Sequence, residues 1–178
     1  AEDFYLTYLK PHLAPRILDR LEEHRRAGHL LVLISGSVRY MLEPVVCDLG
    51  FDRLFCTQLE EGPDGLLTGR SRGAICVDRA KQDCANQYAQ EAGVDLKASF
   101  AYGNHPADIP LLETVGHPHV VEPTRALARI AARRSWPAAS SGPARTSPSG
   151  SASRSSSSTT TRSAGARRAG NGLKRRPT

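Results

Sequence analysis

Small polar residues directly follow one of the apolar segments of this 178-residue chain. Ser35, Gly36 and Ser37 come after the apolar run at 30–34 and before a helical pattern. A hydroxyl and backbone N–H groups at the start of a helix bind anions, because these N–H groups lack partners within the helix. The three residues therefore form a candidate phosphate site, although a serine here also serves as an ordinary helix N-cap.

Oxygen-bearing side chains follow a second apolar segment, at 99–102. Asn104 and Asp108 lie four residues apart across a predicted strand-to-helix turn, and their oxygen atoms suit a hard cation such as Mg²⁺. Lys81 lies on a predicted helix between the two segments, where its ammonium group could neutralise a phosphate or a carboxylate. Each feature also has a structural explanation, since Asx turns and solvated lysines are common.

Apolar periodicity predicts alternating helices and strands between residues 13 and 134. The predicted helices are 15–27, 38–49, 78–92, 107–115 and 124–134. The predicted strands are 30–34, 51–57, 99–102 and 120–121, with a hairpin around Pro63-Asp64-Gly65. Pro44 is expected to split or kink the second helix. This alternation indicates an α/β layer fold with a largely parallel sheet.

The charge of the chain is divided unevenly between two parts. Of the 24 Lys and Arg residues, eight lie between Ala138 and Thr178, where there is no acidic and no aromatic residue. Residues 1–137 therefore hold 16 basic residues against all 18 acidic ones. The segment 138–178 has too few large apolar residues to form a core, so we predict a disordered tail. Any binding of nucleic acid is expected to rest on its eight basic groups.

The rest of the composition favours a cytoplasmic protein without a membrane span. The longest strongly apolar run is Leu30–Ile34, whereas a span needs about 18 apolar residues. We expect no zinc site, because the cysteines lack metal-type spacing and fall in apolar segments, as reduced core residues do. The histidines are likewise interpreted as incidental, including His105, His117 and His119.

Taken in order, five segments resemble motifs of the haloacid dehalogenase superfamily, and most closely its phosphoserine-phosphatase-like subfamily IB. These segments are Leu21–His29, Leu33–Ser37, Leu66–Arg70, Cys76–Lys81 and Ala101–Glu113. The resemblance extends over roughly residues 3–137. It implies a Rossmann-like parallel sheet between helices, with residues 1–15 as a remnant of a helical cap and 16–137 as a partial core.

The resemblance also implies a chemistry and a role for each candidate residue. A phosphoryl group is transferred through an aspartyl-phosphate, with Mg²⁺ as the cofactor and a small phosphorylated metabolite as the substrate. Ser35, with Gly36 and Ser37, would bind the phosphoryl oxygens, and Lys81 would stabilise the nucleophile and the phosphate charge. Asn104 would ligate Mg²⁺ directly. Asp108 would hold the water shell of the metal or orient Lys81.

The chain departs from the family pattern in two respects. It contains no Asp-x-Asp-Gly-Thr motif, so the nucleophile, the central first strand that carries it and most of the cap are expected to be missing. The fourth motif has Asn104 where the family usually has aspartate, which removes a negative charge from the metal site. We therefore expect a fragment of a phosphatase that is inactive alone. A non-catalytic phosphate-binding protein and a basic tail that binds nucleic acid remain alternatives.

Overall fold

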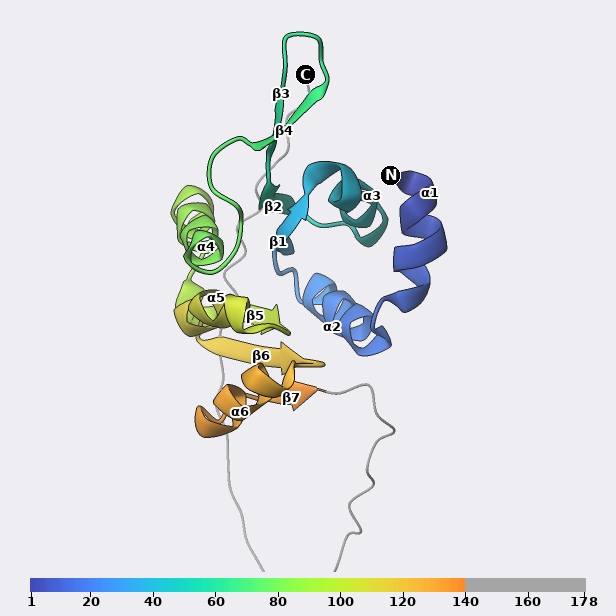
Figure 1. Ribbon diagram of the computed structural model, residues 1–178. Coiled ribbons are helices and arrows are strands. Elements are labelled where there is room, and N and C mark those ends of the chain that lie inside the picture. The colour runs from blue at the N-terminus through green and yellow to red at the C-terminus, as the bar shows by residue number, and fades with distance from the viewer. Residues whose placement is uncertain (140–178) are drawn as a thin grey trace, which may run out of the picture. The chain divides into compact units, whose positions relative to one another are not determined.

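The computed structural model describes residues 1–139, which form an α/β body (Figure 1). Three short helical segments come first: α1 (Glu2–Phe4), the π-helix η1 (Tyr5–Leu9) and the 3₁₀ helix η2 (Lys10–His12). Tyr5 is buried, and its hydroxyl donates a hydrogen bond of 2.6 Å to Asp48. Lys10 donates to the same carboxylate at 2.9 Å. These two bonds fasten the N-terminal segment to the helix that carries Asp48.

Two parallel strands, β1 (Val32–Val38) and β2 (Arg53–Thr57), form the first sheet. The helix α2 (Pro15–Arg26) precedes β1 and begins with a proline, whose missing N–H has no partner to lose at this position. The helix α3 (Arg39–Leu49) makes the crossover that parallel strands require. The first two predicted helices and strands are therefore confirmed, with shifted ends.

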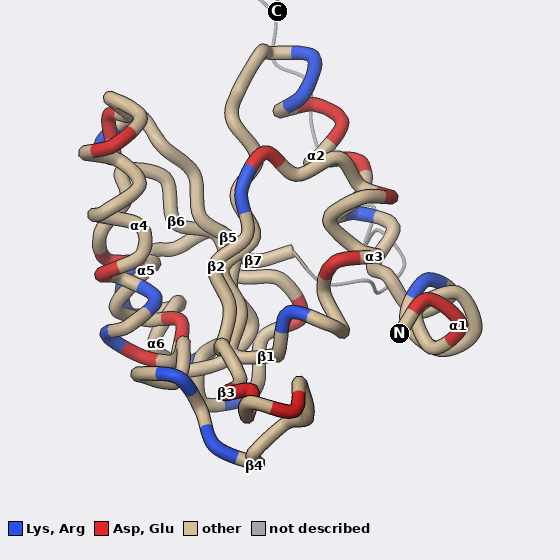
Figure 2. The backbone as a smooth tube through the Cα atoms, turned by 90° about the horizontal axis from the view of Figure 1, so that it is seen from above, with Lys and Arg blue, Asp and Glu red and all other residues tan. Residues whose placement is uncertain are grey.

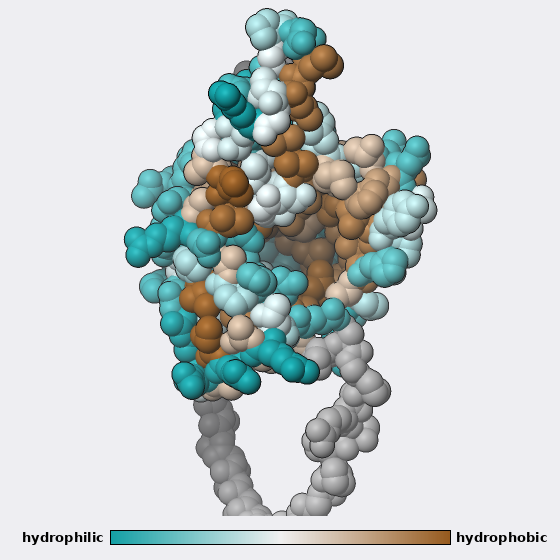
Figure 3. All heavy atoms as spheres, in the orientation of Figure 1, coloured by the Kyte–Doolittle hydropathy of each residue, from teal (hydrophilic) through white to brown (hydrophobic). Residues whose placement is uncertain are grey.

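An antiparallel hairpin, β3 (Leu59–Glu61) and β4 (Leu67–Ser71), follows β2 and projects from the body (Figure 1). In its turn, the N–H of Gly65 donates to the carbonyl of Gly62 at 2.9 Å. Hydrophobic side chains reach the surface along this hairpin (Figure 3), and Leu66 is 68% exposed. The hairpin predicted around Pro63-Asp64-Gly65 is confirmed.

The second sheet has three parallel strands, β5 (Phe100–Gly103), β6 (His117–Val121) and β7 (Ala138–Ala139). Its helical segments are α4 (Arg79–Ala92), η3 (Leu96–Ala98), η4 (Pro106–Asp108), α5 (Ile109–Thr114) and α6 (Arg125–Arg133). Seen along the body in Figure 2, α2 and α3 lie on one side of the strands, and α4, α5 and α6 lie on the other. This confirms the predicted α/β fold with parallel strands between layers of helices.

The main hydrophobic core lies between the second sheet and its helices. Leu112 of α5, Val120 of β6 and Leu127 of α6 are each 0% exposed. The cluster is completed by four further buried residues, Ala101, Leu111, Val115 and Ala131. Thr124 caps α6 by accepting the N–H of Leu127 at 3.4 Å, as the sequence predicted.

Within residues 1–139, no strand lies between β1 and β5. β1 pairs only with β2, and β5 pairs only with β6, so each strand has one unpaired edge. The apolar run at 30–34 predicted a strand covered on both faces, but Val32, Leu33 and Ile34 are only partly buried. These apolar side chains are therefore less buried than the sequence predicted.

The structure corrects the predicted turn after the first strand. Ser35, Gly36 and Ser37 belong to β1, where the pairing register with β2 shifts between Ser35 and Val38. Val38 is the residue before α3, and no side chain caps this helix. The prediction of a serine N-cap was wrong, because the irregular pairing with β2 keeps the backbone extended for three more residues.

Two further corrections concern proline and the end of the body. α3 continues through Pro44 as one helix, so of the two predicted effects of this proline, a split or a kink, the split was wrong. Pro44 has no N–H group, so α3 lacks one backbone hydrogen bond there. The helix tolerates this loss because it packs on both β1 and β2. β7 consists of the two residues directly after the predicted boundary at 137. The remainder of the predicted tail, 140–178, lies outside the described residues.

The helices of the described residues include none that is both long and apolar enough to cross a membrane.

Replacing Leu112 with alanine should lower the free energy of unfolding by about 2–5 kcal/mol, because the lost side chain leaves a cavity in the core. Urea unfolding followed by far-ultraviolet circular dichroism measures this difference. Leu66→Ala is the matched control, and its exposed position predicts a change within about 0.5 kcal/mol. Equal losses from the two substitutions would contradict the assignment of the core.

Candidate active site

A cavity of about 580 Å³ separates the unpaired edges of β1 and β5. Its apolar walls include Ile17 and Leu21 of α2, Ile34 of β1, and Ala85 and Tyr88 of α4. Figure 3 shows a hollow with hydrophobic walls in the region of β1, α2 and α3. We call this cavity the slot.

Some of the polar residues that line the slot come from α4 and from the segments that follow β5 and β6. They are Lys81, Asn104, Asp108 and Glu122. In parallel α/β sheets, ligands bind beyond the carboxyl ends of the strands, which is where the residues after β5 and β6 lie. The slot therefore has apolar walls and a group of polar side chains at the expected position of a site.

A buried ion pair connects Lys81 and Asp108. The Nζ atom of Lys81 donates to Oδ1 of Asp108 at 2.5 Å, and the two side chains are 14% and 8% exposed. A contact between the helices helps to hold this geometry, because Gln82 of α4 donates to the hydroxyl of Thr114 on α5 at 2.9 Å. Removing one partner of a buried pair leaves an uncompensated charge, which typically costs about 3–5 kcal/mol.

The backbone after β5 satisfies the other oxygen of Asp108. Oδ2 accepts the N–H groups of Asn104 and His105, each at 3.0 Å. Gly103 makes this turn possible, because a Cβ atom there would lie 2.7 Å from the Cβ of Asp108. Asp108 is thus held by three donors. Glycine is required at 103 because the side chain of Asp108 lies too close for any larger residue.

The surroundings of Asp108 favour its charged form. Burial alone would raise the pKa of this carboxyl group, but other contacts outweigh burial and lower the pKa below its ordinary value. These contacts are the hydrogen bond and charge of Lys81 and the N–H groups of His105 and Asn104. Asp108 therefore stays ionised at neutral pH and acts as an acceptor only.

The segment Ser35–Ser37 is tied to the loop before α4 through Thr57. The hydroxyl of Thr57 donates to the carbonyl of Gly36 at 2.8 Å and accepts the N–H of Cys76 at 3.2 Å. Gly36 permits this contact, because a Cβ atom there would lie 2.9 Å from a methyl carbon of Val77. The end of β1 is therefore packed directly against the loop that leads to Lys81.

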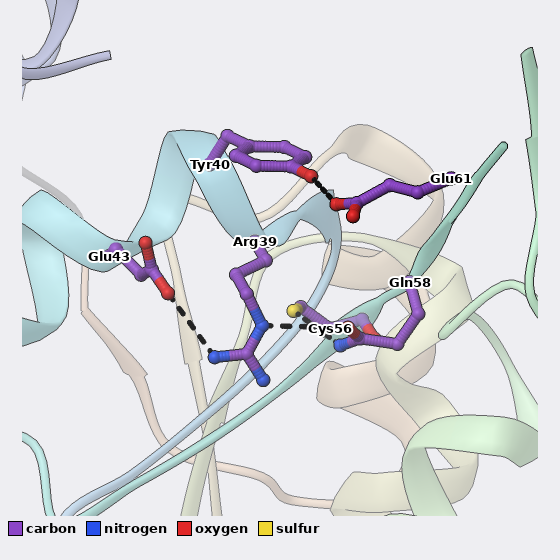
Figure 4. A network of polar contacts seen from close by, with 6 residues as sticks. All are labelled: Arg39, Tyr40, Glu43, Cys56, Gln58 and Glu61. Carbon is purple, nitrogen blue, oxygen red and sulfur yellow. Dashed lines mark hydrogen bonds and ion pairs between the residues drawn. The ribbon is translucent and has the colours of Figure 1, made fainter. Parts of the chain in front are cut away.

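A second polar network holds the start of α3 against the β2–β3 connection (Figure 4). Arg39 lies 3.3 Å from Glu43 and 3.5 Å from the side-chain oxygen of Gln58. The amide nitrogen of Gln58 lies 3.2 Å from both the carbonyl oxygen and the sulfur of Cys56, and Tyr40 donates to Glu61. These contacts fix the residues that follow Ser37 relative to β2.

Two residues beside the candidate site have unusual backbone angles. Asp78, directly before α4, has φ of 48°, and Glu122, directly after β6, has φ of 44°. Residues other than glycine rarely adopt positive φ, and such strain persists only where the surrounding structure enforces it. The strain at Asp78 lies three residues before Lys81, so it belongs to the turn that places this lysine.

The residues present fit part of a Mg²⁺ site. The exposed side chain of Asn104 offers one neutral oxygen, whereas both oxygens of Asp108 already accept hydrogen bonds. In the part of the chain that the structure describes, no group of three or more His, Cys, Asp or Glu residues is placed to hold a metal ion. Further oxygen ligands would have to come from a phosphate, water or another segment.

The structure therefore brings some of the predicted site residues together and leaves others apart. Lys81, Asn104 and Asp108 meet at the slot, as their order along the chain suggested. Ser35 does not line the slot, and its hydroxyl accepts the N–H of Ser37 at 3.1 Å. Sequence reasoning missed Thr57, whose position at the end of a predicted strand was the only available signal.

The fold and the buried Lys–Asp pair define an α/β protein with a charged site beyond its parallel strands. The model of the haloacid dehalogenase-like hydrolase family matches residues 1–113, which is more than half of the chain. The chain belongs to this family.

Curated relatives include phosphatases. A protein named for inhibition of morphological differentiation, from Streptomyces azureus, is 38% identical over 66% of this chain and 42% of its own length. A histidinol-phosphatase from Neisseria meningitidis is 30% identical over 76% of this chain and 62% of its own length. A phosphoserine phosphatase from Lactococcus lactis is 29% identical over 61% of this chain and 50% of its own length. The chain thus spans between 42% and 62% of these relatives.

A solved structure supports the same fold. The crystal structure of a protein of unknown function from Bordetella pertussis Tohama I matches with a TM-score of 0.70 and 29% identity. The match covers 78% of this chain and 63% of that one. The family model and the phosphatase relatives confirm the predicted resemblance to the phosphoserine-phosphatase-like group.

Replacing Lys81 with methionine should raise the pKa of Asp108, because burial then acts against fewer stabilising contacts. In the wild-type chain, the lowered pKa contributes stability above about pH 4, which is lost as the pH falls through the folded-state pKa. The Lys81→Met variant should therefore lose less stability than the wild-type chain as the pH falls through this range. Carbon-13 NMR titration of the Asp108 carboxyl group measures the shift.

Lys97→Met is the matched control, because Lys97 is exposed. It should leave the Asp108 titration unchanged. An unaltered pKa in Lys81→Met would show that the ion pair does not govern Asp108.

Proposed function

We propose that this chain forms part of a phosphomonoester hydrolase that acts through an aspartyl-phosphate and uses Mg²⁺. The chain supplies the groups that manage charge around the phosphate, and the nucleophilic carboxylate belongs to a further strand seated in the slot. The supporting observation is the buried Lys81–Asp108 pair beside a slot whose two long walls are unpaired edges of parallel strands.

The slot suits a strand because of its walls. β1 and β5 each present unpaired backbone groups, and every described neighbour in their two sheets is parallel. Buried backbone N–H and C=O groups need partners, and a strand between β1 and β5 would supply them on both edges. Residues from α2 and α4 cover its two faces with apolar side chains. One strand would thereby join the two sheets into a continuous one.

The proposed reaction has two steps. A carboxylate oxygen of the inserted strand attacks phosphorus, the bond from phosphorus to the ester oxygen breaks, and a second carboxyl group gives the departing alcohol its proton. Water then attacks the phosphorus of the acyl phosphate and loses a proton to that second carboxylate, and the bond from phosphorus to the oxygen of the nucleophile breaks. The products are inorganic phosphate and the restored nucleophile. This chain contains neither of the two carboxyl groups in the expected motif.

The residues of this chain take positioning and electrostatic roles. Lys81 places a positive charge where the nucleophile and the phosphate oxygens meet, and Asp108 fixes the lysine by its 2.5 Å contact. The Oγ atom of Ser35 accepts the N–H of Ser37, and its own O–H group would donate to a phosphoryl oxygen. Asn104 would ligate Mg²⁺, and Asp108 would orient its water molecules. The metal would neutralise the phosphate charge.

The substrate class follows from the relatives and from the site. A histidinol-phosphatase and a phosphoserine phosphatase are both named for small phosphorylated metabolites, and we propose a substrate of this class. The free thiols Cys56 and Cys76 are buried and unpaired by disulfides, which fits a reducing compartment such as the cytoplasm.

The chain alone should not hydrolyse p-nitrophenyl phosphate at millimolar Mg²⁺, because it lacks the attacking carboxylate. Addition of a synthetic peptide with six apolar residues followed by Asp-x-Asp-Gly-Thr should produce turnover. Release of p-nitrophenol measures both results. A peptide with Asn in place of the first Asp is the matched control and should give none.

Turnover without peptide that Lys81→Ala abolishes would overturn the assignment of a missing nucleophile. Peptide that binds without producing turnover, together with phosphate binding by the chain, would favour a non-catalytic phosphate-binding protein instead.

Replacing Asn104 with aspartate should strengthen Mg²⁺ binding, because a carboxylate attracts the ion more than a neutral amide does. The expected gain is about 1–2 kcal/mol, or roughly tenfold in the half-saturating Mg²⁺ concentration, after the cost of a further charge. The half-saturating concentration is measured by following the NMR signals of the backbone amides at positions 103 and 104 during a Mg²⁺ titration of the wild-type chain and of the variant. Asn86→Asp adds the same charge on α4 outside the slot lining, and should have little effect. Equal effects would place the metal elsewhere.

A further inference from the structure

Ring side chains gather where α2 faces the second sheet. Four are imidazoles and two are other aromatic rings: His24, His29, His117, His119, Phe100 and Tyr102. In the described part of the chain these imidazoles do not form a three-ligand metal group. The proposed reaction uses none of them, so the cluster calls for a separate explanation.

The rings on β5 and β6 stack in pairs across the two strands, and we call these four rings the ring surface. Phe100 stacks on His117 with centroids 4.6 Å apart and planes inclined by 20°. Tyr102 stacks on His119 at 5.1 Å and 18°. Alternate residues of a strand share a face, so the side chains at 100, 102, 117 and 119 all lie on the same side of the sheet.

His24 connects α2 to this ring surface. Its Nε2 atom lies 2.8 Å from the hydroxyl oxygen of Tyr102, and its ring centroid lies 4.8 Å from that of Phe100. Its Nδ1 atom lies 2.9 Å from the Nδ1 atom of His29, in the segment between α2 and β1. Both nitrogens of His24 are therefore engaged by groups outside α2.

The contact between the two Nδ1 atoms limits how many protons the pair can hold. A hydrogen bond between them needs one N–H group and one lone pair, which two neutral imidazoles, or one neutral and one charged, can provide. If both rings are protonated, two N–H groups face each other and two positive charges lie about 3 Å apart. A fully protonated pair must therefore separate.

The neighbouring charges give little compensation for protonated imidazoles. On α2, Arg20 repels both His24 and His119, and Glu23 is the acidic group that attracts His24. The carboxylate of Glu23 is paired with Arg20 at 2.5 Å and is 59% exposed. The titratable groups that face His24 from the strands and the connecting segment are Tyr102, His119 and His29, and His117 faces His119.

We propose that these four imidazoles form a proton-sensitive latch that fastens α2 to the β5–β6 sheet. Neutral rings hold the helix by the two His24 contacts and by stacking, and mild acid releases it. Because Ile17 and Leu21 of α2 line the slot, release of the helix removes one wall and opens the slot. The latch concerns the fastening of α2 and does not depend on the proposed reaction.

The direction of the titration agrees with this geometry. Burial lowers the pKa of His24 most, repulsion from His29 and Arg20 adds to it, and Glu23 opposes it. Burial also lowers the pKa of His119, with repulsion from Arg20, His117 and His24. Groups with lowered folded-state pKa values stabilise the fold above about pH 6.5, the ordinary value for histidine. This stability is lost as the pH falls below that value.

Hydrogen exchange measured by mass spectrometry on the full chain tests the latch, at pH 7.5 and pH 5.5 and after correction for intrinsic exchange rates. Amides of α2 should lose protection several-fold at pH 5.5, while amides of α6 in the same molecule keep theirs. His24→Gln retains a donor and an acceptor but does not titrate, so it should remove most of the pH effect. His12→Gln, on η2 outside the cluster, should leave the effect intact.

An α2 protection pattern that does not change between the two pH values would overturn the proposal, as would a full pH effect in His24→Gln combined with His119→Gln. If that double variant does not fold, ring NMR titration of the wild-type chain decides the question. The latch requires the His24 ring to titrate below its ordinary pKa. Titration of His24 at the ordinary value would refute it.

Discussion

The candidate site depends on the cost of a charged carboxylate in a buried position. Asp108 is 6% exposed, and its two oxygens accept hydrogen bonds from Lys81 and from two backbone N–H groups. Meeting this requirement fixes the turn after β5, calls for glycine at 103 and brings the first turn of α4 against the end of the sheet. The positions of α4 and of the turn after β5 are therefore linked to the hydrogen bonds that the Asp108 carboxylate needs.

Much of the fold could be predicted from the sequence, because apolar spacing reflects which face of a helix is buried. This held for the helices around Leu21, Tyr88 and Leu127, whereas the turn residues Pro63-Asp64-Gly65 predicted the hairpin. The end of β1 could not be predicted, since a serine after an apolar run fits a helix cap and an irregular strand equally well. The hydrogen bonds of Thr57 decide between them, and they join residues 21 and 19 positions apart.

The same contrast applies to the site. The order of Lys81, Asn104 and Asp108 along the chain suggested that they meet, and the structure places all three at the slot. The gap between β1 and β5 was expected only from the absence of the family's first motif. The residues that line the slot did not reveal it, because a run such as Val32–Ile34 has the composition of a fully covered strand. The ring surface of Phe100, Tyr102 and His119 was also missed, since histidine has no fixed preference for surface or interior.

The open edges of β1 and β5 also bear on how molecules of this chain meet one another. Exposed strand edges commonly associate with edges of other molecules and lead to aggregation. Here the two edges face each other across the slot, with α2 and α4 contributing to its walls. An inward-facing edge does not meet the same edge of a second molecule without movement of a helix. Self-association through the edges of β1 and β5 is thus restrained by the same helices that form the slot.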